Sequence, residues 1–321
     1  MGGDDNRRMN SNSLIEGVAR LADWGVIRAS GAEAASFLHG QLTSDIVHLG
    51  ASQARLAGYC SAKGRLLASF VVWRNGEDEI LLACSADLLA ATLKRLRMFV
   101  LRAKCVLSDA SDEVPLYGLA GTQASAWLGD APAGTVWNKR ERDGLCAIRL
   151  PDAAGLPRYL CAGGVAPSLP PLPLETWRWL EVRSSVARVQ QATVEQFVPQ
   201  MLNYEVLGGV DFQKGCYPGQ EVVARSQYRG SIKRRSFLFE TGVPATAGDD
   251  VFDAQDPSQP AGRVVNAALQ PEGCPAGSLA LVELKLAALA SDSLHLGGPQ
   301  GASLRRVELP YDLPVEPMPG G

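Results

Sequence analysis

The stretch GGVDFQKGCYPGQEVVARSQYRGSIKRR, Gly208 to Arg235, places a single cysteine in a turn and follows it with a basic run. Cys216 lies between two glycines, which let the backbone adopt conformations and close approaches that other residues resist. Lys214 and Arg225 bring positive charge near the thiol in sequence, and positive charge favours a thiolate. Cys216 is therefore a candidate reactive thiol, although most cysteines of this kind are small buried apolar residues.

A nucleophilic cysteine usually works with a histidine as its base. The chain has three histidines, His39, His48 and His295, and none is close to Cys216 in sequence. A Cys–His pair could therefore form only through the fold, and the sequence leaves it open.

The basic run allows two interpretations. It contains no acidic residue and one interleaved aromatic, Tyr228, among Arg225, Arg229, Lys233, Arg234 and Arg235. Such a run can be a solvated linker face. It can also contact an anion, such as a phosphate, a polyglutamyl or carboxylate tail, or RNA, because arginines beside an aromatic suit phosphate contact and base stacking.

The composition of the 321-residue chain is that of a globular protein with two or three domains, with 46% hydrophobic and 20% charged residues. The net charge of -3 indicates that any basic surface is local. No run of about eighteen apolar residues predicts a membrane span, and no signal peptide is evident. We expect a cytoplasmic protein whose residues 1–13 form a disordered tail.

The seven cysteines are widely spaced, at positions 60, 84, 105, 146, 161, 216 and 274. This spacing contains no C-x-x-C and predicts no local zinc or iron–sulfur ligand set, so we expect no bound metal. It is typical of reduced cytoplasmic thiols. The motifs G-x-x-x-x-G-K-[ST], G-x-G-x-x-G, H-E-x-x-H and G-x-S-x-G are also missing, which removes the usual support for nucleotide hydrolysis, dinucleotide binding, zinc proteolysis and α/β-hydrolase chemistry.

The first third of the chain predicts an α+β layer with helices on one face of a mainly antiparallel sheet. Ser30 and Glu33 form a capping-box pattern that begins a helix running to about Thr43, and a second helix covers about 86–98. Strands are expected at 24–30, 56–60, 66–73, 79–84 and 100–107, with a turn at 75–78.

The pattern then restarts and finally changes character. Strands at 117–120, 146–150 and 159–161, a helix at 122–128 and helical segments at 174–185 and 194–207 predict a second α/β unit. Short alternating strands beyond residue 235 predict a small β-barrel. The expected domains are 14–110, 111–232 and 233–310, followed by an extended tail, 311–321.

Two tryptophans are the best-placed stacking walls for a flat heteroaromatic ligand. Trp24 begins the first strand, and Trp177 lies on a helix after the proline-rich segment 163–174. The alternative is that both are core residues.

The octapeptide KGCYPGQE, Lys214 to Glu221, resembles the signature of the YgfZ family of folate-binding proteins, which is related to the T-protein (aminomethyltransferase) of the glycine cleavage system. The segments FVPQMLNYEVLGGVDFQ (197–213), GQLTSDI (40–46) and YCSAKGR (59–65) also resemble that family.

This resemblance implies a multi-domain cloverleaf, with two α/β ferredoxin-like lobes and a C-terminal antiparallel β-barrel around a central folate channel. It implies tetrahydrofolate or a one-carbon derivative as ligand, and a role in iron–sulfur cluster assembly or maintenance. Partners would be iron–sulfur enzymes or assembly proteins, including enzymes that modify tRNA. Cys216, with Lys214, would be the functional thiol site. Residues expected to bind folate are Trp24, Trp177 (or its neighbour Trp179), Gln220, Glu221 and Arg225.

Two departures from the related sequences matter. Ser184 to Ala187 replaces a turn that contains glycine and proline in family members, which affects the choice of Trp177. The T-protein segment that carries an essential aspartate corresponds to Gly64 to Ser69 here, and neither Ala68 nor Ser69 can act as a base near neutral pH.

Three functions follow from these observations. The first is a folate-binding accessory protein of iron–sulfur metabolism with Cys216 as its thiol. The second is an enzyme, a folate-dependent one-carbon transferase, which the missing aspartate disfavours. The third is an RNA-contacting module that uses the basic run, with Arg229, Lys233, Arg234 and Arg235 as its anion contacts.

Overall fold

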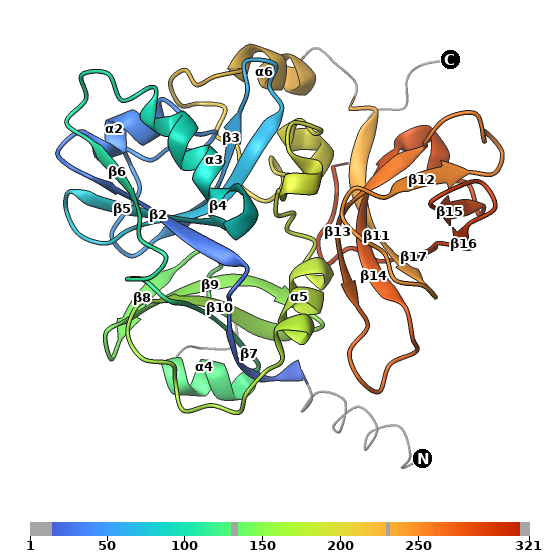
Figure 1. Cartoon of the computed structure of the whole chain (residues 1–321), viewed down its shortest axis with the longest axis horizontal. Helices are drawn as coiled ribbons and strands as arrows, with labels where there is room; N and C mark the ends of the chain where they lie inside the picture. The colour runs from blue at the N-terminus through green and yellow to red at the C-terminus, as the bar shows by residue number, and fades with distance from the viewer. Residues whose placement is uncertain (1–14, 130–133, 229–231, 315–321) are drawn as a thin grey trace.

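The computed structural model describes residues 15–129, 134–228 and 232–314, so the predicted N-terminal tail, most of the C-terminal tail and Arg229 lie outside the described residues. The strands form three antiparallel sheets, and Figure 1 shows them around the segment that follows helix α5 (Leu174–Arg183). The predicted α+β class is therefore confirmed.

The first sheet has five strands in the order β3 (Ala54–Cys60), β4 (Leu66–Arg74), β5 (Glu79–Ser85), β2 (Trp24–Ser30) and β6 (Val106–Asp109). Successive side chains of a strand face opposite sides of the sheet. In β4, Phe70 and Val72 pack among residues that include Leu93 of helix α3 (Ala86–Arg97), whereas Val71 and Trp73 join the core shared with the second sheet. Because both faces are covered, the strand is almost wholly buried.

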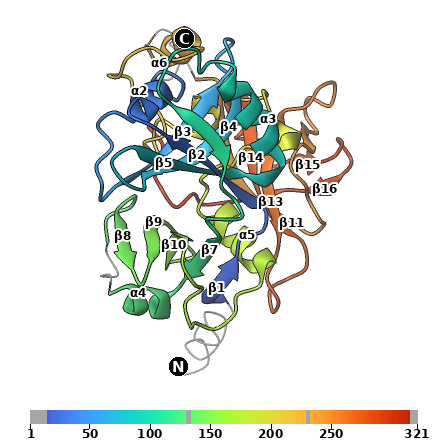
Figure 2. The same cartoon turned by 60° about the vertical axis from the view of Figure 1, so that its left-hand side comes forward.

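The second sheet has the order β1 (Gly17–Arg20), β7 (Leu116–Ala120), β10 (Leu156–Ala162), β9 (Leu145–Ala153) and β8 (Lys139–Arg142). Although β1 precedes the first sheet in sequence, it pairs with β7. Helix α4 (Thr122–Leu128) packs on this sheet beside β7 and β10. In the turned view of Figure 2, β1 and α4 lie at the end of the molecule opposite helix α6 (Gln220–Tyr228).

The C-terminal sheet is a nearly closed, seven-stranded antiparallel barrel, in agreement with the small β-barrel that the sequence predicts. Its order is β16 (Ala302–Ser303), β15 (Leu294–Leu296), β12 (Asp250–Asp253), β13 (Gly262–Leu269), β14 (Ser278–Lys285), β11 (Arg234–Thr241) and β17 (Arg305–Val307). Its core contains alternate residues of β11 and β14, such as Phe237, Phe239 and Val282.

The element bounds agree with several sequence predictions. Strands β2, β3, β4 and β5, helices α3 and α4, and the first of the two helical segments, now α5, lie where the sequence places them. Helix α2 is shorter than predicted, Ala34–His39.

Other predictions were wrong. Helix α2 begins at Ala34 with Glu33 at its N-cap, so Ser30, the last residue of β2, does not cap it. The carboxylate of Glu33 instead accepts a bond from the amide of Lys104 at 2.6 Å. The predicted strand at 100–107 forms only as β6. The segment 194–207 is mostly turns and contains one short 3₁₀ helix, Pro199–Leu202, while another, Gln191–Thr193, precedes it. Helix α6 and strands β1 and β8 have no counterpart in the sequence analysis.

Helix α5 packs between the second sheet and the barrel, and one glycine lets it approach the sheet. The indole of Trp177 covers Gly118 of β7, where a Cβ atom would lie 2.4 Å from the ring. Trp177 is fully buried in the core that the first two sheets share. The close contact of α5 with the sheet therefore requires glycine at position 118.

We predict that Gly118→Ala destabilises the protein by about 1–3 kcal/mol, because the added methyl group displaces a rigid buried ring. Gly242→Ala is the matched control, since the space beside Gly242 is open, and it should change stability by less than about 0.5 kcal/mol. Denaturant unfolding checks both variants. Equal stability of the two would contradict this account of the α5 contact.

Candidate functional site

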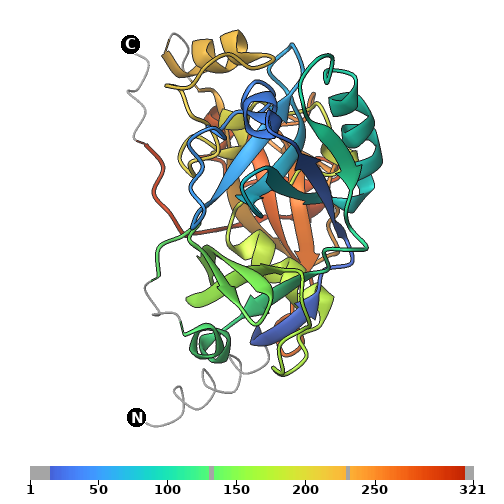
Figure 3. The ribbon, with the colours of Figure 1, turned by 90° about the vertical axis from the view of Figure 1, so that its left-hand side faces the viewer.

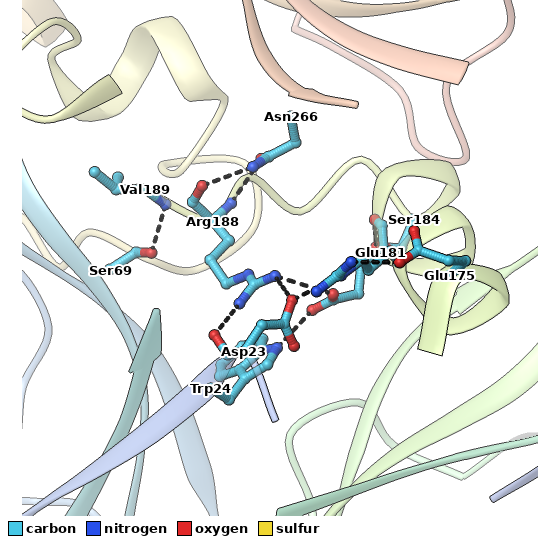
Figure 4. Close-up of polar contacts among 10 residues, drawn as sticks. Asp23, Trp24, Ser69, Glu175, Glu181, Ser184, Arg188, Val189 and Asn266 are labelled. Carbon is cyan, nitrogen blue, oxygen red and sulfur yellow. Dashed lines mark hydrogen bonds and ion pairs between the residues drawn. The ribbon is translucent and has the colours of Figure 1, made fainter. Parts of the chain in front are cut away.

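The centre of the molecule is organised around the guanidinium of Arg188, which follows α5. Its Nη1 donates to the carbonyl oxygen of Asp23 at 2.9 Å, and its Nη2 lies 2.8 Å from an Asp23 carboxylate oxygen and 3.4 Å from a Glu181 oxygen. The same guanidinium lies over the Trp24 ring, 4.7 Å from the centroid. Figure 4 shows these groups converging from β2 and α5.

The charges of this cluster depend on one another. Burial would raise the pKa of Asp23, but Arg188 and then Arg178 hold it below its ordinary value. Burial raises the pKa of Glu181, and the charge of Arg188 only partly opposes this. Glu181 is thus the carboxyl group of the cluster whose charge burial disfavours most.

The backbone at Arg188 and Val189 also joins the barrel to the first sheet. Its amide donates to the side-chain oxygen of Asn266 in the barrel, at 2.9 Å, and the Asn266 amide returns a bond to the Arg188 carbonyl at 2.8 Å. The next amide, that of Val189, donates to the Ser69 hydroxyl of the first sheet at 2.9 Å.

Beside this cluster lies an inner cavity of about 40 Å³. Trp24, Arg158 and Glu181 line it, together with Ser69 of β4 and Trp137. Trp24 donates its indole N–H to Glu181 at 3.1 Å. Arg158 is almost fully buried, with Nη1 lacking a hydrogen-bond partner, and burial lowers its pKa to about 10. The cavity therefore presents an acceptor and a donor among apolar walls, in room for about one water.

An outer groove of about 580 Å³ opens on the other side of Leu56 and Trp137, which line both spaces. Its walls come from β3, from residues 135–138 and from the segment 208–213, and Tyr228 of α6 completes them. Trp137 has a backbone φ of 68°, a conformation that costs energy for a residue other than glycine. The groove has the size of a small-molecule site, and the inner cavity does not.

The two predicted stacking tryptophans have different environments. Trp24 lines the inner cavity, with Arg188 over its ring. Trp177 is not among the cavity-lining residues, and the guanidinium of Arg158 lies 5.1 Å from the centroid of its ring. Trp179 is partly buried and donates to Gln270 of the barrel. Trp24 could therefore contact a ligand in the inner cavity directly. Trp177 could affect such a ligand only through Arg158, which lines the cavity and lies over the Trp177 ring.

Cys216 is exposed on the loop that leads into α6, whereas five of the other six cysteines are buried. Lys214 holds this loop to the end of α2: its ammonium donates to the carbonyl oxygens of His39 and, at 2.7 Å, Leu42. Cations suit the C-terminal end of a helix. Burial lowers the pKa of Lys214 to about 8.

Helix α6 carries the remaining residues of the signature. Gln220 begins the helix, and the exposed Glu221 and Arg225 form an i,i+4 pair at 2.7 Å. Neither side chain lines the inner cavity or the outer groove, so their folate contacts stay predictions. In Figure 3, α6 lies at one end of the molecule, near α2.

The basic run is divided by its surroundings. Arg234 makes a bidentate ion pair with Glu283 of the neighbouring strand β14. Arg235 is buried and pairs with Glu205 at 2.7 Å. Lys233 is exposed. The structure thus uses Arg234 and Arg235 to hold β11, while Arg229 lies outside the described residues.

Sequence reasoning missed Glu181, Arg188, Arg158 and Trp137. Glu181 lies on α5 with the buried Trp177, and Arg188 follows that helix, so charged residues close in sequence to a buried tryptophan were the available signal. Arg158 and Trp137 had none, because their burial depends on how the second sheet meets the first.

The overall fold of the chain is similar to that of a solved structure. The chain is similar to the solved structure of glycine cleavage system aminomethyltransferase T from Bartonella henselae, with a TM-score of 0.70 over 91% of this chain and 85% of that one, at 16% identity. The protein therefore has the aminomethyltransferase T fold.

Curated relatives identify the family. The chain is 36% identical over 240 residues to the tRNA-modifying protein YgfZ of Edwardsiella ictaluri, covering 68% of this chain and 69% of the relative. It is 30% identical over 310 residues to the YgfZ of Sodalis glossinidius, covering 91% and 92%. The chain belongs to the YgfZ family. No family model matches it.

The described residues contain neither a metal-binding cluster of His, Cys, Asp or Glu side chains nor a helix long and apolar enough to cross a membrane. Among residues 15–129, 134–228 and 232–314, no group of three or more His, Cys, Asp or Glu side chains is arranged to hold a metal ion. In the same described parts of the chain, helices are too short or too polar to cross a membrane.

We predict that Arg235→Met lowers the free energy of unfolding by about 3–5 kcal/mol, because it leaves the Glu205 carboxylate buried without this guanidinium. Lys233→Met is the matched control from the same run and should cost less than about 0.5 kcal/mol. Thermal or urea unfolding measures both. A neutral Arg235→Met would mean that the ion pair with Glu205 does not stabilise the protein.

Proposed function

We propose that this protein is a folate-binding accessory protein that supports tRNA modification by helping to assemble or maintain iron–sulfur enzymes. In this proposal tetrahydrofolate binds in the centre of the molecule, and Cys216 is the functional thiol. The observation that carries the folate part is the inner cavity, where the buried Glu181 carboxylate and the partnerless Nη1 of Arg158 lie beside the Trp24 indole. The names of the YgfZ relatives support the link to tRNA modification.

The chemistry of these residues fits a pterin. A pterin offers neighbouring N–H donors on one edge, which suit a carboxylate, and a ring carbonyl, which suits a guanidinium donor. Glu181 would take the donor edge and Arg158 the carbonyl. Trp24 would supply an apolar face. When bound, tetrahydrofolate supplies a carrier for a one-carbon unit.

The size of the inner cavity sets a condition on this proposal. About 40 Å³ is far below the roughly 300–1000 Å³ of ligand pockets. A pterin therefore requires the wall of Leu56 and Trp137 to move, which would join the inner cavity to the outer groove. The strained backbone of Trp137 suits a residue that changes conformation. The outer groove would then hold the glutamate end of the folate.

The alternative of a one-carbon transferase is weaker. Ala68 and Ser69 lie where the T-protein resemblance places an essential aspartate, and the Ser69 hydroxyl is used to accept the Val189 amide. Neither residue can hold a charge or move a proton near neutral pH.

Cys216 would act at the surface. One cysteine cannot ligate a cluster alone, so contact with an iron–sulfur cluster must be shared with a partner. Its exposure suits such a contact.

We expect calorimetric titration with 5-formyltetrahydrofolate, a stable reduced folate, to show saturable binding. Glu181→Gln should weaken this binding by about 10- to 100-fold, because it removes a charge-assisted acceptor. Glu175→Gln, on the exposed side of the same helix, is the control and should bind as the unaltered protein does. If Glu181→Gln binds the folate as tightly as the unaltered protein does, the pterin does not contact Glu181. If the folded, unaltered protein does not bind the folate at all, the folate proposal is wrong.

We expect Cys216→Ala to keep its fold and its folate affinity, yet fail to restore the activity of an iron–sulfur tRNA-modifying enzyme in a strain that lacks its own YgfZ protein. The level of the modified nucleoside in tRNA is the readout. Cys274→Ala, which removes the other exposed thiol, should restore it. Full restoration by Cys216→Ala would remove the thiol from the mechanism.

A further inference from the structure

The fold brings a histidine to the cysteine loop, which the sequence left open. His39 ends helix α2, and its Nε2 faces Gly215, the residue before Cys216: a Cβ atom on Gly215 would lie 3.6 Å from Nε2, in ordinary contact. Lys214 bonds the main chain of His39, which fixes the loop against this histidine. Cys216 therefore directly follows the glycine whose Cβ position lies beside this imidazole nitrogen.

A carboxylate orients this imidazole. The Nδ1 of His39 lies 3.0 Å from a carboxylate oxygen of Asp45. Burial would raise the pKa of Asp45, but bonds from the amide and ring of His48 and the charges of both histidines hold it at about 2. An ionised carboxylate only accepts hydrogen bonds, so Nδ1 of neutral His39 must carry the proton. Its Nε2 then has a free lone pair toward the Cys216 loop.

The other two histidines do not occupy this position. The side chain of His48 is 78% exposed and bonds the second oxygen of Asp45 at 2.6 Å. His295 lies on β15 of the barrel, where its ring is bonded to the Gly301 carbonyl oxygen. His48 therefore shares the carboxylate of Asp45 and provides a natural comparison for His39.

We propose that His39 is the base of the Cys216 thiol, positioned by Asp45, so that the three residues form a thiol–imidazole–carboxylate site. The Sγ–H bond of Cys216 breaks, its proton goes to Nε2 of His39, and the electron pair stays on sulfur, ready for a soft electrophile. This inference deepens the proposed role of Cys216 and rests on it.

The charges around the site are consistent with this assignment. Asp45, in the segment after α2, faces the His39 ring, and His48 bonds the other oxygen of the same carboxylate. Lys214, on the same loop as Cys216, interacts electrostatically with Asp45, Asp211 and Cys216. The Lys214 ammonium is bonded to carbonyl oxygens, which leaves the proton transfer to His39.

The test is alkylation of the intact protein by iodoacetamide, followed residue by residue with mass spectrometry across a range of pH. Sulfur bonds to the methylene carbon, iodide leaves, and the proton passes from His39 to water. Cys274 is exposed and serves as an internal reference in the same sample. In the unaltered protein, alkylation of Cys216 should reach half of its plateau at a lower pH than alkylation of Cys274.

His39→Gln keeps a polar group that can reach Asp45 but cannot take the proton. It should slow alkylation of Cys216 at pH 7 by roughly tenfold or more relative to Cys274. His48→Gln is the matched control, and its ratio of the Cys216 alkylation rate to the Cys274 alkylation rate should stay within about twofold of that in the unaltered protein. Asp45→Asn should lower the ratio, because a side-chain amide can both donate and accept and so does not select the same tautomer of His39.

Several outcomes would overturn the proposal. These are coincident pH profiles of Cys216 and Cys274 in the unaltered protein, an unchanged ratio in His39→Gln, or equal losses in the His39 and His48 variants. The first needs no variant, so it decides the matter even if His39→Gln does not fold. If the His39 proposal fails in one of these ways, the Cys216→Ala restoration experiment still tests the role of the thiol separately. A positive result there would mean that Cys216 acts without His39 as its base.

Discussion

The architecture depends on the placement of one charged side chain, the guanidinium of Arg188, at the junction of three sheets. Burying an arginine is costly unless carboxylates and carbonyl groups surround it, and Asp23 and Glu181 provide them. The backbone of Arg188 meanwhile pairs with Asn266 of the barrel. Removing this residue would leave Glu181 without this guanidinium and Asp23 with Arg178 alone, so the first sheet, α5 and the barrel share one electrostatic constraint.

That constraint also shapes the site. Glu181 and Trp24 belong to the charge cluster and to the inner cavity at once. Asp211, Phe212 and Gln213, which line the outer groove, lead directly into the loop that carries Cys216. A ligand that filled the groove would therefore lie against the segment that sets the position of the thiol. This continuity offers a physical route by which ligand binding and thiol chemistry could affect each other.

The success of sequence reasoning followed the range of the interactions involved. Strands β2 to β5 and helix α3 were predictable because period-2 and period-3.6 patterns are local. Ser30 and Glu33 were misread because the pairing of β2 with Glu79 extends the strand through the expected cap. Helix α6 was missed because its sequence carries glycine and proline signals at the start and few apolar residues, and only Val223 of it is buried.

The sequence by itself determined the family, the α+β class and the importance of the turn around Cys216, since these are carried by contiguous residues. Tertiary structure alone decided which charges are free and which side chains meet. Arg234 and Arg235 read as a basic surface until strand pairing and burial gave them Glu283 and Glu205. His39 reached the Cys216 loop from 177 positions away in the chain (216 − 39), because a loop and a helix end pack together, and no local pattern encodes such a contact.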